Sequence, residues 1–279
     1  MKKKFRCRDL NPGLSGESRP TTKWSKKIQK EWRILKKDLP DTIYVRVYES
    51  RIDLLRAVIM GAKGTPYDNG LFFFDIHFPE KYPDKPPKVH YHSGGLRINP
   101  NLYANGKVCL SLLNTWFGAK NEKWTPGVST MLQVLVSIQG MVLNAKPYFN
   151  EPGFSGSRGT ITGEKNSIAY NERTLVLSLK TMVYTMNKPP KIFEDLVIGH
   201  FRDRAHGILT AFQAYMEEGN EVKSTTDKGK KETGSKKIQE GCKRVHGGTC
   251  KGFSNYRSRR FGNIRAPNSS RIPNSGTNT

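Results

Sequence analysis

Residues 98–116 read Ile98-Asn-Pro-Asn-Leu-Tyr-Ala-Asn-Gly-Lys-Val-Cys109-Leu-Ser-Leu-Leu-Asn-Thr-Trp116, and the rest of the chain is arranged on either side of this stretch. Its asparagine, proline and glycine pairs are typical of turns and predict a shaped loop rather than a helix or strand. Cys109 follows Asn101 by eight residues in this polar loop. Lys107 lies close by, and a nearby cation favours the nucleophilic thiolate form of a cysteine. The loop therefore predicts that Cys109 is a catalytic nucleophile.

The chain before this loop predicts one helix followed by strands. Residues 24–39 place apolar side chains at helical spacing and lysines on the opposite face, and Pro40 ends the pattern. Apolar runs then predict four strands, at 43–48, 54–62, 71–78 and 88–93. In the third strand, Phe72 and every second residue after it share one face. Short turns between these strands predict an antiparallel meander with one strongly apolar face.

A proline-rich crossing, Phe78 to Pro87, joins the third and fourth strands. Four prolines in ten residues exclude regular secondary structure and predict an extended segment. An aromatic residue before proline makes the Tyr82–Pro83 peptide bond a candidate for the cis form.

The chain after the loop predicts helices. Thr125 is a suitable N-cap and Pro126 a suitable first helical residue, so a buried helix is expected over residues 126–143. Apolar spacing predicts three further helices, over 168–186, 192–201 and 208–216. The expected fold class is α+β: an N-terminal helix, a four-stranded antiparallel meander sheet, a catalytic cysteine loop, a central helix and a C-terminal helical extension.

Positive charge is concentrated at the two ends of the chain, whose net charge is +23. Residues 1–38 hold 13 lysines and arginines against four acidic residues, and residues 219–279 hold 14 against four. Low hydrophobicity without periodicity predicts disorder at 1–21 and 219–279, which leaves 22–218 as the catalytic domain. Basic ends suit an acidic protein partner, nucleic acid or a nuclear-import signal, and they also suit simple solubility.

The sequence predicts a cytosolic or nuclear protein. The N-terminus is charged and lacks the apolar run of a secretory signal. No segment approaches the roughly 20 apolar residues of a membrane span, so a membrane is not expected among the partners. Of the four cysteines only Cys109 lies in the well-patterned middle, and a disulfide framework is not expected.

Two groups of residues resemble incomplete metal sites. His90 and His92 share one face of the fourth predicted strand, but no third ligand lies at a suitable spacing. Cys242, His246 and Cys250 offer three ligands in the tail, where a structural zinc site normally has four. We therefore expect no bound metal.

A cysteine hydrolase is the first alternative for a reactive thiol in a loop. Such an enzyme needs a histidine base beside the thiol and usually a third orienting group. His90 and His92 are the histidines close to Cys109 in the sequence, but they belong to a predicted strand. The residues around Cys109 carry neither a papain-like nor a caspase-like signature. The sequence gives protease activity little support.

Four motifs, in this order, closely resemble the ubiquitin-conjugating enzymes. They are Tyr82-Pro83-x-x-Pro86-Pro87, Asn99-Pro100-Asn101, Gly106-Lys-Val-Cys109-Leu and Trp124-Thr-Pro126. The resemblance covers roughly residues 22–154. The extension to about residue 217, which includes Tyr148-Phe-Asn-Glu-Pro-Gly-Phe154, resembles the large plant subclass that is related to the animal hybrid conjugating and ligase enzyme.

The resemblance implies a chemistry that does without a Cys–His pair. Cys109 would accept the C-terminal glycine of ubiquitin as a thioester from an ATP-using activating enzyme and pass it to a lysine amine. Because a thioester is already activated toward amines, no strong dedicated base is required. Asn101 would donate its amide to the tetrahedral oxyanion. Glu151, just before Pro152, would position the incoming lysine. No cofactor of the chain's own is implied.

The resemblance also implies partners: ubiquitin, the activating enzyme, a substrate protein and a candidate ubiquitin ligase. The cationic face of the first helix would meet the activating enzyme, through Lys26, Lys27, Lys30 and Arg33. A ligase would contact the loops that carry Asp84, Lys85 and Pro126. Asp84 and Lys85 stand where ligase-binding members often carry an apolar residue, which leaves ligase independence open.

Two further positions depart from the family pattern. Asn99 replaces the family histidine, whose role is mainly structural, so the departure concerns the packing of the loop. Residues 117–123, between Trp116 and Trp124, form an insertion relative to short members near the thioester, where it could shape the choice of acceptor.

Two other function classes remain as alternatives. A catalytically silent ubiquitin-binding variant is disfavoured because Cys109 and Asn101 are both present. A basic nucleic-acid-binding protein would place function in the tails, which attract phosphates but lack the regular aromatic residues of a stacking platform. Nucleic acid is therefore not expected as a partner.

Overall fold

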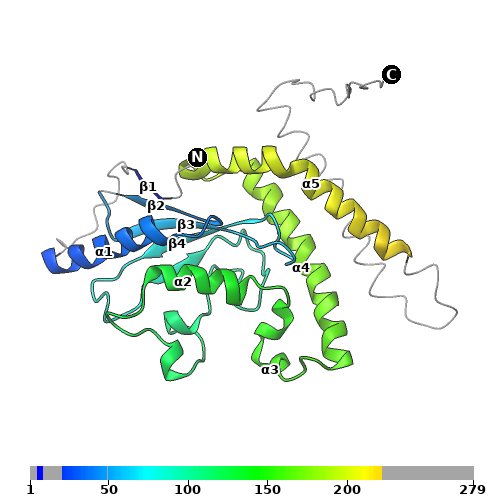
Figure 1. Ribbon diagram of the computed structural model, residues 1–279, viewed down its shortest axis with the longest axis horizontal. Coiled ribbons are helices and arrows are strands. Elements are labelled where there is room, and N and C mark those ends of the chain that lie inside the picture. The colour runs from blue at the N-terminus through cyan, green and yellow to red at the C-terminus, as the bar shows by residue number, and fades with distance from the viewer. Residues whose placement is uncertain (1–4, 9–20, 49, 222–279) are drawn as a thin grey trace, which may run out of the picture.

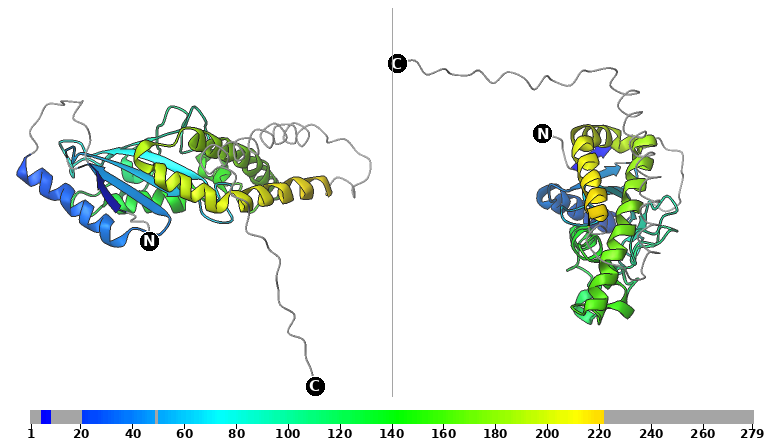
Figure 2. Two further views of the ribbon diagram at one scale, coloured as in Figure 1. Left: turned by 90° about the horizontal axis from the view of Figure 1, so that it is seen from above. Right: turned by 90° about the vertical axis from the view of Figure 1, so that its right-hand side faces the viewer.

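The computed structural model describes residues 5–8, 21–48 and 50–221. Figure 1 shows one sheet with α2 on one side and α5 on the other, and the second view of Figure 2 shows the same layers. No helix in the described ranges is long and apolar enough to cross a membrane. The elements are β1 (Phe5–Arg8), α1 (Thr22–Asp38), β2 (Ile43–Tyr48), β3 (Leu54–Met60), β4 (Leu71–His77), β5 (Lys88–Tyr91), α2 (Met131–Ser137) with a π-helical turn (Ile138–Val142), α3 (Pro152–Ser155), α4 (Ile161–Asn187) and α5 (Glu194–Glu221).

Helix α1 is the amphipathic helix that the sequence predicts. The side chain of Thr21 caps it by accepting a backbone hydrogen bond from the first turn at 3.3 Å. Ile28 and Leu35 are fully buried against the sheet layer, and most of the basic side chains are exposed. The helix ends before Pro40, which confirms the predicted element.

Strands β2 to β5 form the predicted antiparallel meander. Strand β1 adds a fifth strand, parallel to β2, with Phe5 opposite Val45. The predicted four-stranded meander is confirmed, and the prediction of disorder throughout residues 1–21 does not hold at Phe5–Arg8. Four residues among lysines and arginines are too short for their alternation to stand out, and pairing with the backbone of β2 places them in the sheet.

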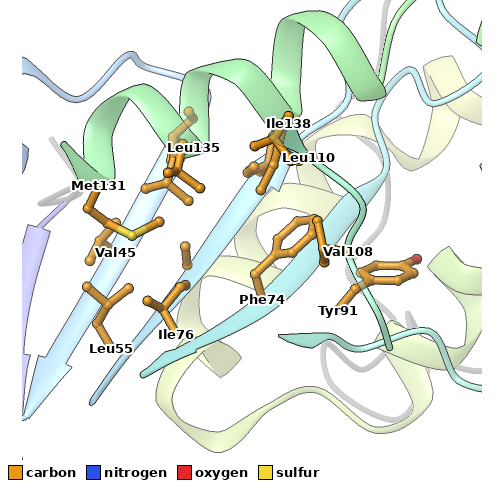
Figure 3. Packing of buried hydrophobic residues seen from close by; sticks show 14 of the residues in the cluster. Val45, Leu55, Phe74, Ile76, Tyr91, Val108, Leu110, Met131, Leu135 and Ile138 are labelled. Carbon is orange, nitrogen blue, oxygen red and sulfur yellow. The ribbon is translucent and has the colours of Figure 1, made fainter. Parts of the chain in front are cut away.

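The first face of the sheet carries the larger apolar cluster. Phe72, Phe74 and Ile76 alternate along β4 and belong to this cluster, as predicted. Figure 3 shows residues of α2 and its π-helical turn, among them Met131 and Ile138, packed over this face. The sheet therefore fixes α2, which lies beside the cysteine loop.

The second face is covered by the C-terminal extension. Leu71 and Phe73, which alternate with the residues of the first face, pack with Met182 of α4 and with Val197 and Phe201 of α5. Because both faces of the sheet are buried, residues 54–62 read as a continuous apolar run rather than an alternating one. The extension is thus part of the folded domain.

The central helix begins later than predicted. Thr125 and Pro126 are not its N-cap and first residue, because Gly127 has φ +79°, in the left-handed region that interrupts a helix. Thr130 caps the helix instead: its hydroxyl accepts from the backbone of Gln133 at 3.2 Å, and the Gln133 side chain accepts from the backbone of Thr130 at 2.9 Å.

The C-terminal extension has two long helices, where the sequence predicts three. Helix α4 starts at Ile161, earlier than residue 168, and ends before Pro189. The predicted helices 192–201 and 208–216 are wrong as separate elements, because α5 is continuous through them. The intervening segment is mostly polar and exposed, which breaks the apolar period, and Gly207 is tolerated inside the helix.

The folded region extends slightly beyond the predicted domain. Because α5 ends at Glu221, the helix passes the predicted domain boundary at residue 218. Residues 222–279 lie outside the described residues.

A buried carboxylate joins three segments of the first layer. Glu31 of α1 is 6% exposed and accepts a hydrogen bond from the Tyr82 hydroxyl at 2.8 Å and from the Met131 backbone at 2.9 Å. The Tyr82–Pro83 peptide bond is cis, as predicted, and the indole of Trp124 donates to the Pro83 carbonyl at 2.6 Å. Glu31 therefore ties α1 to the proline-rich crossing and to the start of α2.

Candidate active site

The cysteine loop is held from within by Asn99, which is fully buried. The Asn99 side chain accepts a hydrogen bond from the backbone of Asn101 at 2.8 Å. Its amide nitrogen donates to the Tyr67 hydroxyl at 2.8 Å and to the Val142 carbonyl at 2.7 Å. Asn99 thus links the loop to β3–β4 and to the end of the central helix. The replacement of histidine at this position leaves the loop well anchored.

Asn101 and Cys109 are joined by two hydrogen bonds. The backbone N–H of Cys109 donates to the carbonyl of Asn101 at 2.9 Å, and the Asn101 side-chain amide donates to the carbonyl of Cys109 at 3.0 Å. Asn101 Oδ1 is buried and has no hydrogen-bond partner among the described residues. The amide is therefore anchored through its nitrogen alone, next to the cysteine. The structure brings together these two predicted residues.

The thiol of Cys109 is not preactivated. Cys109 is 1% exposed, and burial raises the pKa of its thiol above the ordinary value. The cation of Lys107 and a hydrogen bond from the Tyr103 hydroxyl lower the pKa, but burial is the larger effect. Among the described residues, the groups that act on this pKa include no histidine. Lys107 is thus a weaker activator than the sequence alone suggests.

Tyr103 is a site residue that the sequence analysis did not identify. Its ring lies under the guanidinium of Arg97, 4.5 Å from the ring centroid, and the Lys107 ammonium is 5.7 Å from the same centroid. Its hydroxyl lowers the pKa of the Cys109 thiol. An aromatic residue two positions after Asn101 is the signal that could have identified it. Arg97, Lys107 and Tyr103 therefore all act on the thiol.

Glu151 lines a cleft that also includes Arg97 and Pro100 of the cysteine loop. It is the residue before α3, and its carboxylate is 3.9 Å from the guanidinium of Arg97. The negative charge of Glu151 raises the pKa of the Cys109 thiol, which places the two groups within electrostatic reach. Glu151, Arg97, Pro100 and Phe154 line a cleft of about 310 Å³, which we call the Glu151 cleft. Glu151 is thus near the thiol, as predicted.

A second cleft has a volume of about 300 Å³. Leu110 and Ser111, which directly follow Cys109, line it together with Val128 and Met141. The predicted insertion reaches this cleft through Asn121 and Glu122. Phe117, the aromatic residue of the insertion, is 86% exposed. The cysteine loop and the residues directly after Cys109 therefore contribute to two clefts that are built from different parts of the chain.

The predicted partner surfaces are mostly exposed. Lys26, Lys30 and Arg33 are exposed on α1, and Lys27 is half-buried. The loops with Asp84, Lys85 and Pro126 are also exposed. The hydrogen bond from Trp124 to Pro83 holds these two loops together. The two ligase-contact loops are therefore neighbours in the fold.

The candidate metal ligands do not gather into a cluster. His92 contacts the carboxylate of Asp75 at 2.7 Å, and the His90 ring lies against Gly106, where a Cβ would come within 2.0 Å. Across the part of the chain that the structure describes, no group of three or more His, Cys, Asp or Glu side chains could hold a metal. The tail residues Cys242, His246 and Cys250 lie outside that part.

The raised pKa of Cys109 predicts slow alkylation at neutral pH. Because iodoacetamide reacts with the thiolate, the rate at Cys109 should rise with pH and reach half its maximum above the ordinary cysteine pKa of about 8.5. Removing the exposed cation in Lys107→Met should raise the midpoint and slow alkylation at pH 7 by at most about fivefold. Peptide mapping measures the reaction at each cysteine. A midpoint below the ordinary value would show that the loop activates the thiol.

Comparison with known proteins places this site in a family. A family profile described as "Ubiquitin-conjugating enzyme" matches residues 27–180, more than half of the chain. The "Probable ubiquitin-conjugating enzyme E2 25" of Arabidopsis thaliana is 69% identical over 192 residues, which are 69% of this chain and 32% of that protein. The "Probable ubiquitin-conjugating enzyme E2 23" of the same plant is 60% identical over 204 residues, 73% of this chain and 18% of that protein.

A human relative confirms the resemblance to the hybrid enzyme. The "Dual E2 ubiquitin-conjugating enzyme/E3 ubiquitin-protein ligase BIRC6" of Homo sapiens is 45% identical over 164 residues, 57% of this chain and 3% of that protein. The chain spans about a third of the length of the first relative and less of the other two. The matched region contains the cysteine loop, α2 and most of α4. The chain belongs to the ubiquitin-conjugating enzyme family.

Proposed function

We propose that this chain accepts ubiquitin as a thioester on Cys109 from an activating enzyme and transfers it to a lysine of a substrate protein. The observation that carries the proposal is the pair of hydrogen bonds that holds the amide of Asn101 beside Cys109. A hydrolase would need a base for the thiol, and burial leaves the pKa of this thiol raised. An acyl carrier needs only a thiol, an oxyanion donor and access for an amine.

In the first step, Cys109 takes the acyl group from the activating enzyme. The sulfur of Cys109 attacks the carbonyl carbon of the ubiquitin thioester, and the bond to the activating enzyme's sulfur breaks. The departing thiolate takes up the proton that Cys109 releases to solvent. The hydrogen bond from Tyr103 and the cation of Lys107 stabilise the transient Cys109 thiolate.

In the second step, a lysine amine displaces Cys109. The C–N bond forms, the C–S bond breaks, the amine releases a proton and the Cys109 thiolate regains one. Negative charge develops on the carbonyl oxygen in between. One hydrogen of the Asn101 amide serves the carbonyl of Cys109, and the second is available to this oxygen. The carboxylate of Glu151 attracts the incoming ammonium toward the thioester.

The proposal includes the partners of the family. The exposed cations of α1, Lys26, Lys30 and Arg33, suit an acidic surface of the activating enzyme. The joined loops with Asp84, Lys85 and Pro126 would contact a ligase. ATP is consumed by the activating enzyme, and the chain would need no cofactor of its own. A reducing compartment, cytosol or nucleus, suits a protein that works through a free thiol.

Charging tests the proposed function. The full chain, incubated with ubiquitin, an activating enzyme and ATP, should form a ubiquitin adduct that thiol reductant removes, as seen on nonreducing gels. Addition of free lysine should then discharge the adduct and leave ubiquitin attached to lysine. An adduct that forms without ATP, or no adduct at all, would contradict the proposal.

A further inference from the structure

The Glu151 cleft carries two arginines that the chemistry above does not use. Arg97 comes from the cysteine loop, and Arg173 comes from α4, far along the chain. Arg173 is exposed and forms no ion pair with any residue in the described ranges. Against these two cations the cleft holds one carboxylate, that of Glu151. The cleft therefore has an excess of one positive charge.

The lining residues come from two sides. Arg97 and Pro100 belong to the cysteine loop, and the Glu151 carboxylate is 3.9 Å from the guanidinium of Arg97. Pro100 adjoins Asn101, whose amide is hydrogen-bonded to the carbonyl of Cys109. Arg173 belongs to α4. Glu151 and Arg97 thus lie on the side of the cleft formed with the cysteine loop, and Arg173 lies on the α4 side.

Aromatic rings line the same cleft. The rings of Tyr148 and Phe154 are stacked with centroids 4.6 Å apart and planes within 4°. Tyr170 packs beside Tyr148, with centroids 6.1 Å apart. Figure 1 shows α3, which carries Phe154, beside one end of α4. Ion pairs along this wall are stronger than on an open surface because the rings exclude water from one side.

We propose that the Glu151 cleft binds a carboxylate side chain of the acceptor protein, a few residues away from the lysine that receives ubiquitin. The proposal rests on the proposed function. Glu151 attracts the lysine ammonium on the side of the cysteine loop, and Arg173 pairs with the acidic side chain on the α4 side. A guanidinium forms two parallel hydrogen bonds to a carboxylate, which fixes the orientation of the bound segment.

The acidic residue is expected close to the lysine in the acceptor sequence, because Glu151 and Arg173 line one cleft. An extended peptide advances about 3.3 Å per residue, so placements of two to five residues sample about 7–17 Å. A basic neighbour would meet the uncompensated charge of Arg173 and be disfavoured. The preference belongs to the enzyme itself and is expected without a ligase.

Peptide acceptors test the proposal. The full chain is charged with ubiquitin and then mixed with peptides that hold one lysine and one glutamate, placed two to five residues away on either side. Each peptide is paired with its glutamine counterpart, and single-turnover discharge is measured. For at least one placement the glutamate peptide should react about three- to fivefold faster, and high salt should abolish the difference.

Variants identify the cleft as the cause. Arg173→Ala should bring the glutamate-to-glutamine rate ratio close to one, and Arg173→Lys should restore part of it. Arg173→Glu should invert the preference toward a peptide that carries arginine at the same place. Lys165→Ala removes the same charge from α4 at an exposed residue outside the cleft, and it should leave the ratio unchanged.

The rate ratios and the discharge onto free lysine together decide whether the cleft assignment or the proposed function fails. A wild-type ratio near one for every placement, or a ratio that Arg173→Ala does not change, would overturn the proposed cleft. Discharge of the wild-type adduct onto free lysine is measured alongside the peptides. If that discharge fails, the proposed function fails; if it succeeds while the ratio stays near one, only the cleft assignment fails.

Discussion

Asn101→Ala should still accept ubiquitin but should discharge it onto lysine on the order of 100-fold more slowly, the usual effect of removing one oxyanion donor. The reason is that the amide of Asn101 is anchored next to Cys109 through its nitrogen, while its oxygen has no partner among the described residues. Attack on the activating enzyme's thioester forms a tetrahedral carbon as well, but there the activating enzyme supplies its own surroundings. Single-turnover charging and discharge rates separate the two steps.

If Asn101 only supported the loop, Asn101→Ala would slow charging and discharge alike and would lower the stability. Loss of its bond to the Cys109 carbonyl costs about 1 kcal/mol and should lower the melting temperature by only a few degrees. Asn99→Ala is the matched control, because it breaks the three hydrogen bonds that anchor the loop but removes no group beside the thiol. It should lower the melting temperature more and slow both steps alike. Equal discharge by Asn101→Ala and wild type would refute the oxyanion role.

Glu31→Ala should destabilise the domain by about 2–5 kcal/mol, because it breaks the link between α1, the proline-rich crossing and the start of α2. Its carboxylate is buried and accepts from the Tyr82 hydroxyl and the Met131 backbone, so truncation leaves two buried donors without a partner. For a domain of about 200 residues, this loss corresponds to roughly 5–15 °C in melting temperature. Denaturant unfolding of the full chain measures the free energy directly.

Tyr82→Phe and the double variant control this prediction. Tyr82→Phe removes one donor and leaves Glu31 bonded to Met131, so it should cost about 1 kcal/mol. The effects of Glu31→Ala and Tyr82→Phe should not add, because the second change removes a donor that the first has already stranded. Additive effects, or a loss below 1 kcal/mol in Glu31→Ala, would show that the carboxylate does not join the three segments.

The sequence predicts well those elements that periodicity defines. Alternation from Phe72 onward placed one face of β4 in the core, and the spacing of lysines and apolar residues defined α1. Where local geometry competes with composition, the prediction is wrong. Gly127 adopts a left-handed conformation that the preceding Thr-Pro pair does not reveal. Helix α2 therefore starts at Met131 and not at the predicted Pro126. Strand β1 depends on its partner strand, which no local pattern encodes.

The residues of the candidate site likewise fall into those that sequence motifs predict and those that they do not. Cys109, Asn101 and Glu151 could be identified from sequence motifs, and the structure brings them close together. Tyr103 was missed although its position two residues after Asn101 offered a signal. Arg173 offered none, because it reaches the cleft only through the packing of α4 beside the loop. Residues contributed by the helical extension are therefore the part of the site that only the fold reveals.

The most direct test asks which cysteine carries ubiquitin. The full chain has three other cysteines, Cys7, Cys242 and Cys250, which serve as internal controls. After charging, intact-mass spectrometry should show one ubiquitin added with loss of one water, and the adduct should vanish on addition of thiol. The adduct should persist when the three other cysteines are replaced by alanine and be absent in Cys109→Ala. An adduct that survives Cys109→Ala, or resists thiol, would contradict the account.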